Sequence, residues 1–170
     1  MNLEYKELIP ENFHDSSKVW IYQSNKMFLL SEALEIETML ENFCTQWKSH
    51  GFAVKGFATL LFGQFIVLMA DESETEVGGC STDSSIHLIK KIEEKMNVSL
   101  LNRQLLAFYS KNKIQTIPLS QFQYAIENKF IDAETLYFNN VVATKKELLN
   151  SWILPIKNSW LQQKIKSVSI

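Results

Sequence analysis

The first part of the chain alternates between short apolar runs and one long segment with helical spacing. Val19-Trp20-Ile21-Tyr22 is β-branched and aromatic, which predicts a short strand. A helix is then predicted between Ser31, which suits the N-cap, and His50-Gly51, where the glycine suits the left-handed position after a helix. The apolar face of this helix comprises Ile36, Met39, Leu40, Phe43 and Trp47.

Two strands and a second helix are predicted next. Phe52–Phe62 favours a strand that turns at Gly63-Gln64. Phe65–Ala70 is apolar throughout, as a central strand that is buried on both faces requires. An acidic loop follows, and then a helix whose apolar face comprises Ile86, Ile89, Ile92 and Met96.

A strand at Leu105–Tyr109, turned back at Lys111–Lys113, completes a recognisable order of elements. The order strand, helix, strand, strand, helix, strand is typical of the split βαβ arrangement. We therefore expect an α+β fold of 170 residues in a single domain. Its core, residues 17–117, is expected to be a ferredoxin-like βαββαβ sandwich with an antiparallel sheet, and residues 118–170 a C-terminal α/β extension.

Two capping boxes predict helices in the extension. Ser120-x-x-Gln123 predicts the start of the first helix and Thr144-x-x-Glu147 the start of the second. In a capping box the side chain of each of the two residues accepts a hydrogen bond from the backbone N–H of the other. Leu136–Phe138 predicts a strand between them. Trp152 and Trp160 then either staple the tail onto the sheet or form a contact between copies of the chain, since tryptophan is enriched in interfaces.

Composition and charge exclude several classes of protein. Apolar residues make up 46% of the chain and the net charge is -2, which excludes a disordered chain. Residues 1–96 carry a net charge of -7 and residues 97–170 one of +5, so the surface is either simply solvated or polarised to attract an anionic ligand. Arg103 is the only arginine, which argues against nucleic acid and against ligands with several phosphates.

The cellular setting is expected to be a reducing cytoplasm. Cys44 and Cys80 are too few for a disulfide framework, and the first residues lack the pattern of a signal peptide. The longest apolar stretch, Phe52–Ala70, approaches the length of a membrane span. It contains Lys55 and the Gly63-Gln64 turn, so two strands explain it better and no membrane span is expected.

The segment from Gly79 to Asp83 is the most informative for chemistry. Glycine is followed by Cys80 and by three residues that suit a helix N-cap, namely Ser81, Thr82 and Asp83. Free amides at a helix N-terminus attract anions and lower the pKa of a thiol. The Asp83 carboxylate would raise the pKa of the Cys80 thiol. The alternative without chemistry is an inert cysteine that is buried behind an N-cap.

The expected topology places a partner near Cys80. In a ferredoxin-like sheet this end of the molecule gathers Cys80 and Asp83 with His14, His50 and Lys111, which allows a Cys80–His50 catalytic dyad. His87 lies four residues after Asp83 and is more suited to a surface pair with it. The spacing of a metal site is absent, so neither a metal nor another cofactor is expected.

Five segments together resemble a small uncharacterised bacterial family whose members are often labelled "ABC transporter ATPase". They are Trp20-Ile21-Tyr22-Gln23-Ser24-Asn25, Trp47-x-x-His50-Gly51, Gly79-Cys80-Ser81-Thr82-Asp83, Phe138-Asn139-Asn140 and Trp152-x-x-Pro155-x-x-x-Ser159-Trp160. The resemblance implies no catalytic residues. The label implies ATP hydrolysis, but a P-loop requires Gly-Lys-Ser/Thr, and this sequence has no such tripeptide.

Two functions follow as hypotheses. The first is a protein that binds a small anionic ligand at the Gly79–Asp83 turn through Gly79, Ser81, Thr82 and Asp83, with thiol chemistry at Cys80 assisted by His50. The alternative is a non-enzymatic structural or interaction module that acts as a homodimer or larger homo-oligomer. In either case we expect no ATPase activity.

Overall fold

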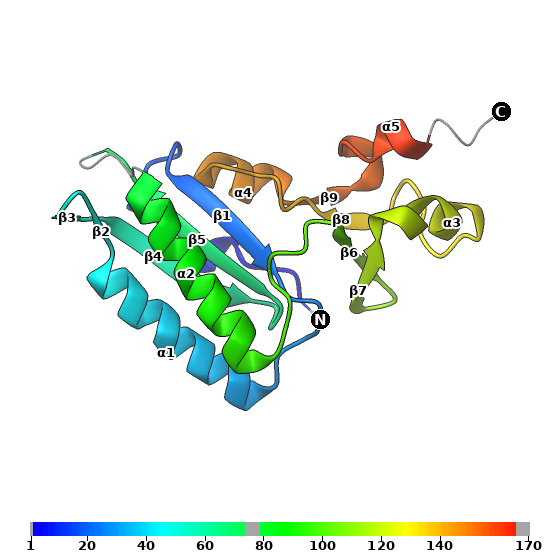
Figure 1. Cartoon of the computed structure of the whole chain (residues 1–170). Coiled ribbons are helices and arrows are strands. Elements are labelled where there is room, and N and C mark those ends of the chain that lie inside the picture. The colour runs from blue at the N-terminus through cyan, green and yellow to red at the C-terminus, as the bar shows by residue number, and fades with distance from the viewer. Residues whose placement is uncertain (1, 74–78, 166–170) are drawn as a thin grey trace.

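The fold is α+β with antiparallel sheets, as expected. The computed structural model describes residues 2–73 and 79–165, with residues 79–81 described by their backbone alone. Two main sheets lie beside each other, with helices packed on them (Figure 1).

The first sheet has the strand order β1-β5-β4. It consists of β1 (Lys18–Gln23), β4 (Lys55–Leu61) and β5 (Phe65–Asp71), all antiparallel to their neighbours. Every residue of β5 is buried, which confirms the central strand predicted from its apolar run. The edges of this sheet are β1 and β4.

Two helices cover one face of this sheet. They are α1 (Leu30–Gln46) and α2 (Gly79–Met96), and they lie side by side across the strands (Figure 1). Their buried residues pack on β5 in one core cluster, which includes Ile36, Leu40, Ile89, Ile92, Ile66 and Leu68. The helical spacing of the apolar residues therefore identified both inward faces.

The N-terminal segment and α4 (Lys145–Ser151) cover the opposite face. Tyr5 is buried there against the ring of Trp152, with ring centroids 4.8 Å apart. The Tyr5 hydroxyl donates to the Leu148 carbonyl at 2.6 Å. Trp152 is fully buried, so it staples the tail onto the first sheet, one of the two roles expected for it.

The second sheet has the order β7-β6-β8-β9. Its strands are β6 (Leu105–Ser110), β7 (Lys113–Pro118), β8 (Leu136–Phe138) and β9 (Ile153–Pro155). Two short helices pack on it, namely α3 (Phe122–Glu127) and α5 (Gln162–Ile165). The sheet takes strands from both sides of residue 117, which was the expected limit of the core.

The complete ferredoxin-like sheet is not confirmed. The order β1-β5-β4 agrees with the first three strands of that topology, but β6, expected as the fourth strand, pairs with β7 and β8 instead. The edge of β1 contacts the chain before α4, through an isolated bridge between Lys18 and Thr144. Lys111, expected near Cys80, therefore turns the hairpin of the second sheet.

Two helix boundaries differ from the sequence prediction. The helix α1 begins at Leu30, so Ser31 lies inside its first turn, and the Leu29 N–H donates to the Glu32 carboxylate at 2.7 Å. It ends at Gln46, before a small hairpin of β2 (Lys48–Ser49) and β3 (Phe52–Ala53). His50 and Gly51 form the turn of that hairpin, with φ of 50° and 86°. Gly51 therefore has the expected left-handed backbone, but it lies in the turn between β2 and β3 rather than at the end of the helix.

The two capping boxes have opposite outcomes. Thr144 caps α4 as predicted, because its hydroxyl accepts from the Glu147 N–H at 3.2 Å and the Glu147 carboxylate accepts from the Thr144 N–H at 3.2 Å. Ser120 makes no such bond and lies in a 3₁₀ turn, η2 (Leu119–Gln121). The helix α3 begins only at Phe122, so this prediction was wrong.

Candidate functional site

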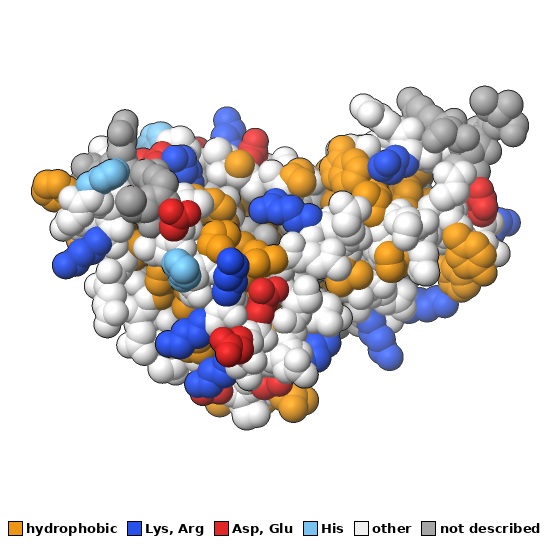
Figure 2. Space-filling view, viewed as in Figure 1, with side chains coloured by type: hydrophobic (Ala, Val, Ile, Leu, Met, Phe, Trp, Pro, Cys, Tyr) orange, Lys and Arg blue, Asp and Glu red, His pale blue; other side chains and the backbone are white. Residues whose placement is uncertain are grey.

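Two adjoining hollows run along the outer edge of β1, the edge away from β5, between the two sheets. They measure about 220 Å³ and about 90 Å³, and we call them together the edge groove. Five residues line both: Ile21, Tyr22, Arg103, Asn140 and Val141. On the face shown in Figure 2, cationic and hydrophobic side chains lie side by side between the two sheets.

Backbone geometry determines which groups of β1 face the groove. The Val19 N–H donates to the Ala143 carbonyl at 2.9 Å, and the Lys145 N–H donates to the Ser17 carbonyl at 2.9 Å. In an antiparallel ladder the N–H and C=O of one residue point to the same side, successive residues point to opposite sides, and residues two positions apart, such as Val19 and Ile21, point to the same side. The N–H and C=O of Ile21 therefore point away from β5, toward the groove.

The chain opposite Ile21 turns away from β1. The Asn140 N–H donates to the Phe138 carbonyl at 3.0 Å, and the Val142 N–H donates to the Asn139 carbonyl at 3.3 Å. These local bonds form a turn where a continuing strand would have paired with β1. Among the residues that the structure describes, none forms a hydrogen bond with the backbone of Ile21 across this edge.

A network of side-chain hydrogen bonds joins two residues that line the groove, Gln23 and Asn140. The Asn140 amide donates to the Gln23 side-chain oxygen at 2.8 Å, and the Gln23 amide donates to the Leu105 carbonyl at 3.2 Å. The Trp152 indole N–H donates to the Asn140 side-chain oxygen at 3.0 Å. Gln23 and Trp152 are buried, so this network fixes the position of Asn140 between the two sheets.

Arg103 supplies the positive charge of the groove. It lies in the connection between α2 and β6, its side chain is exposed, and it forms no ion pair with any described residue. Its charge acts on the Tyr22 hydroxyl. Burial raises the pKa of Tyr22, while a hydrogen bond with Ser85 and the Arg103 charge oppose that rise.

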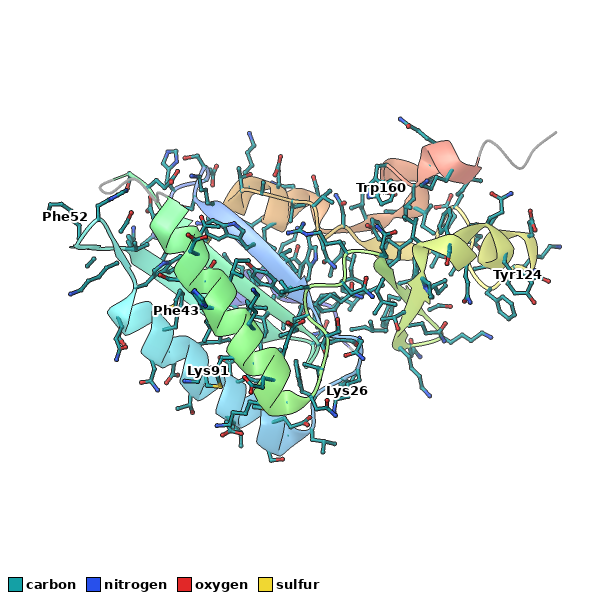
Figure 3. The ribbon with its side chains drawn as sticks, viewed as in Figure 1. Lys26, Phe43, Phe52, Lys91, Tyr124 and Trp160 are labelled. Atoms are coloured by element: carbon teal, nitrogen blue, oxygen red, sulfur yellow. The ribbon has the colours of Figure 1, made fainter. Side chains whose placement is uncertain are left out.

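Trp160 lines the hollow of about 90 Å³ with its aromatic ring. It lies in the segment between β9 and α5 (Figure 3) and is 40% exposed. Its indole N–H donates to the Tyr137 hydroxyl at 3.3 Å, and burial raises the pKa of Tyr137. Trp160 is thus held by the second sheet at the rim of the groove.

The site expected at the Gly79–Asp83 turn is only partly described. Gly79, Cys80 and Ser81 are described by their backbone alone, so the Cys80–His50 dyad stays a prediction. The helix α2 already begins at Gly79, so Ser81, Thr82 and Asp83 lie inside its first turns rather than before it. Thr82 and Asp83 line neither hollow of the edge groove.

The histidines have separate surroundings. His14 follows the N-terminal segment and donates its backbone N–H to the Asp71 carboxylate at 3.3 Å, while His50 is in the β2–β3 turn. His87 and Asp83 form no ion pair with each other, so the expected surface pair was wrong. The described residues contain no cluster of three or more histidine, cysteine or acidic side chains that would hold a metal ion.

The groove itself was not predicted from the sequence. Gln23 and Asn140 belong to two of the five segments discussed above, and Arg103 is the single arginine, but no motif links them. Nothing in the local pattern shows that residues 23, 103 and 140 meet. Their meeting depends on the pairing of β6 with β8, whereas the ferredoxin-like expectation placed β6 in the first sheet.

Comparisons with protein-family models, with curated proteins and with solved structures gave no match. Among the described residues, no helix has the length and apolar character needed to cross a membrane.

Proposed function

We propose that the protein binds a small anionic ligand in the edge groove, with Arg103 as the group that pairs with the anion. The observation that carries this proposal is an exposed guanidinium without an ion-pair partner among the described residues, at the side of a hollow. A guanidinium presents a planar set of donors that matches a carboxylate or a phosphate. The ligand class is the one expected from the sequence, and the proposed place is different.

The surroundings of Arg103 favour a ligand with one anionic group and an apolar part. Val141 and Leu101 contribute apolar surface to the groove, and Trp160 contributes an aromatic ring. A single arginine suits one carboxylate or one phosphate monoester rather than a chain of phosphates. Small-ligand sites commonly combine an apolar lining with a few fixed polar groups in this way.

The lining favours binding over catalysis. The described residues of both hollows include no histidine, cysteine, aspartate or glutamate that would serve as a nucleophile or a general base. The polar side chains present are amides, the phenols of Tyr22 and Tyr137, tryptophan indoles and one guanidinium, which bind and orient a ligand. We therefore propose a binding protein and assign no reaction to this groove.

Titration by NMR tests this function. The probes are benzoate and phenyl phosphate, which carry one anionic group on a ring, and neutral benzamide as the uncharged control. We expect the signals of the Arg103 side chain and of the Ile21 and Asn140 backbone amides to shift saturably with the anions and much less with benzamide.

Two variants make the test specific. Arg103→Gln should weaken anion binding about tenfold or more, because a hydrogen bond to a charged group contributes about 1.5–3 kcal/mol. Lys91→Gln removes the same charge from the exposed face of α2, which lies outside the groove (Figure 3), and should bind as the unmodified protein does. Equal binding by Arg103→Gln and the unmodified protein would refute the proposal.

A further inference from the structure

We infer that the ligand of the edge groove is a short peptide that ends in a free carboxylate and pairs with the backbone of Ile21. This inference rests on the proposed function and names the class of its ligand. It starts from the edge of β1, because Ile21 directs one N–H donor and one C=O acceptor into the groove without a described partner.

Such a pair of groups matches one residue of an extended peptide. In an antiparallel ladder, two facing residues exchange both of their backbone hydrogen bonds. A residue of the ligand would donate its N–H to the Ile21 carbonyl and accept from the Ile21 N–H through its own carbonyl. Addition of a strand to an open sheet edge is an established mode of peptide recognition.

The protein itself already uses this edge for pairing. Two residues before Ile21, the Val19 N–H donates to the Ala143 carbonyl, so the ladder between β1 and the chain before α4 is formed up to that point. It stops because the chain turns away at Asn140. A ligand strand would continue a ladder that the fold has begun.

Two hydrogen bonds limit the length of a ligand strand along β1. The Val19–Ala143 bond lies on one side of Ile21, and the Gln23–Asn140 bond lies on the other. Residues 19 and 23 are four positions apart, which is about 13 Å in a strand. That length accommodates roughly two or three peptide residues.

Arg103 then selects for the end of a peptide. It lines both hollows together with Ile21, so a ligand paired with Ile21 would have its next residues near the guanidinium. A free terminal carboxylate satisfies that charge, whereas a peptide continuing through the groove would leave it unpaired. Val141 and Leu101 favour small apolar side chains on such a peptide.

Three dipeptide probes test the inference. The first is acetyl-Ala-Ala with a free carboxylate, the second its C-terminal amide, and the third the free acid with the N–H of the first alanine methylated. We expect each of the two to bind about tenfold or more weakly than the first, because the amide lacks the negative charge that pairs with Arg103 and the N-methylated peptide lacks the N–H that donates to the Ile21 carbonyl.

Hydrogen exchange of single amides provides an independent readout. Binding of acetyl-Ala-Ala should slow the exchange of the Ile21 amide, whereas the Val19 amide, already bonded to Ala143, should change little. The slowing should disappear in Arg103→Gln and persist in Lys91→Gln at the same peptide concentration.

The outcomes separate this inference from the proposed function. If benzoate binds through Arg103 but the N-methylated peptide binds as tightly as the unmethylated one, the peptide inference is wrong and the proposed function stands. If neither benzoate nor acetyl-Ala-Ala depends on Arg103, both fail. Tight peptide binding that leaves Ile21 exchange unchanged would also overturn the pairing with β1.

Discussion

Asn140 donates a hydrogen bond to the side-chain oxygen of Gln23 at 2.8 Å, and this bond joins two residues that are 117 positions apart in the chain. Gln23 ends β1 in the first sheet, and Asn140 follows β8 in the second. The Trp152 indole N–H donates to the same Asn140 side chain at 3.0 Å. One amide therefore connects the two sheets and the stapled tail.

Replacing Asn140 by alanine should destabilise the protein by about 1–3 kcal/mol, because it leaves the Gln23 oxygen and the Trp152 N–H without this partner. Unfolding in urea, followed by tryptophan fluorescence, measures the change. Asn42→Ala on the exposed face of α1 is the matched control and should change stability by less than about 0.5 kcal/mol. Equal effects of both variants would contradict the role given to Asn140.

The two capping boxes allow a paired test of stability. Thr144→Ala removes a hydroxyl that accepts from the Glu147 N–H and should cost about 1 kcal/mol. Ser120→Ala removes a hydroxyl that caps no helix and should change the free energy of unfolding by less than about 0.5 kcal/mol. Urea unfolding midpoints measure both changes. A larger loss of stability in Ser120→Ala than in Thr144→Ala would contradict the structure.

The difference between these two motifs shows what local sequence can predict. Both have a hydroxyl residue followed three positions later by a side chain that can return the bond. In the Ser120 motif, the side chain of Gln123 instead donates to Glu127 at 3.0 Å, and the backbone forms a 3₁₀ turn after Pro118. Competition from a partner one helical turn away is not visible in a four-residue pattern.

Most elements of the first sheet could be predicted because burial determines their residues. The unbroken apolar run of β5 required a central strand, and the spacing in α1 and α2 required inward faces. The sheet that receives β6 could not be predicted this way. Phe108 is fully buried in the second sheet, but it would satisfy the same local pattern in the first. The position of the groove depends on that long-range choice.

Purified protein is expected not to hydrolyse ATP. The sequence lacks the Gly-Lys-Ser/Thr of a P-loop, whose lysine and backbone amides hold the phosphates. Phosphate release from ATP with magnesium should equal that of a heat-denatured sample. Hydrolysis that saturates with ATP, requires magnesium and follows the protein through a final sizing column would overturn this expectation.

Cys44 should react slowly in the folded protein. It is half-buried in α1, and burial raises the pKa of its thiol to about 11, so little reactive thiolate forms near neutral pH. In Cys80→Ser, which leaves Cys44 as the sole thiol, iodoacetamide labelling should be slow at neutral pH and should rise steadily with pH. Labelling should become fast in urea. Equal rates in the folded and unfolded protein would refute this shielding.

Asp71 should make stability depend on pH in the acid range. This carboxylate is only 3% exposed at the end of β5, and it accepts from the Lys55 ammonium at 2.9 Å and from the N–H groups of Ser73 and His14. Burial alone would raise the pKa of Asp71, but these donors outweigh it and hold that pKa well below its usual range.

A carboxyl with a depressed pKa in the folded state stabilises the protein at every pH above its ordinary pKa of about 4. That contribution is lost progressively as the pH falls toward the folded-state value. Asp71→Asn should therefore be less stable than the unmodified protein by about 1–3 kcal/mol at neutral pH, a range that allows for the partial exposure of Lys55. The difference in stability between Asp71→Asn and the unmodified protein should narrow below about pH 4.

Urea midpoints between neutral pH and about pH 2.5 measure this difference in stability. The exposed Glu41→Gln is a charge-matched control and should stay close to the unmodified protein. A difference for Asp71→Asn that stays constant over this range would show that the carboxylate charge does not stabilise the fold.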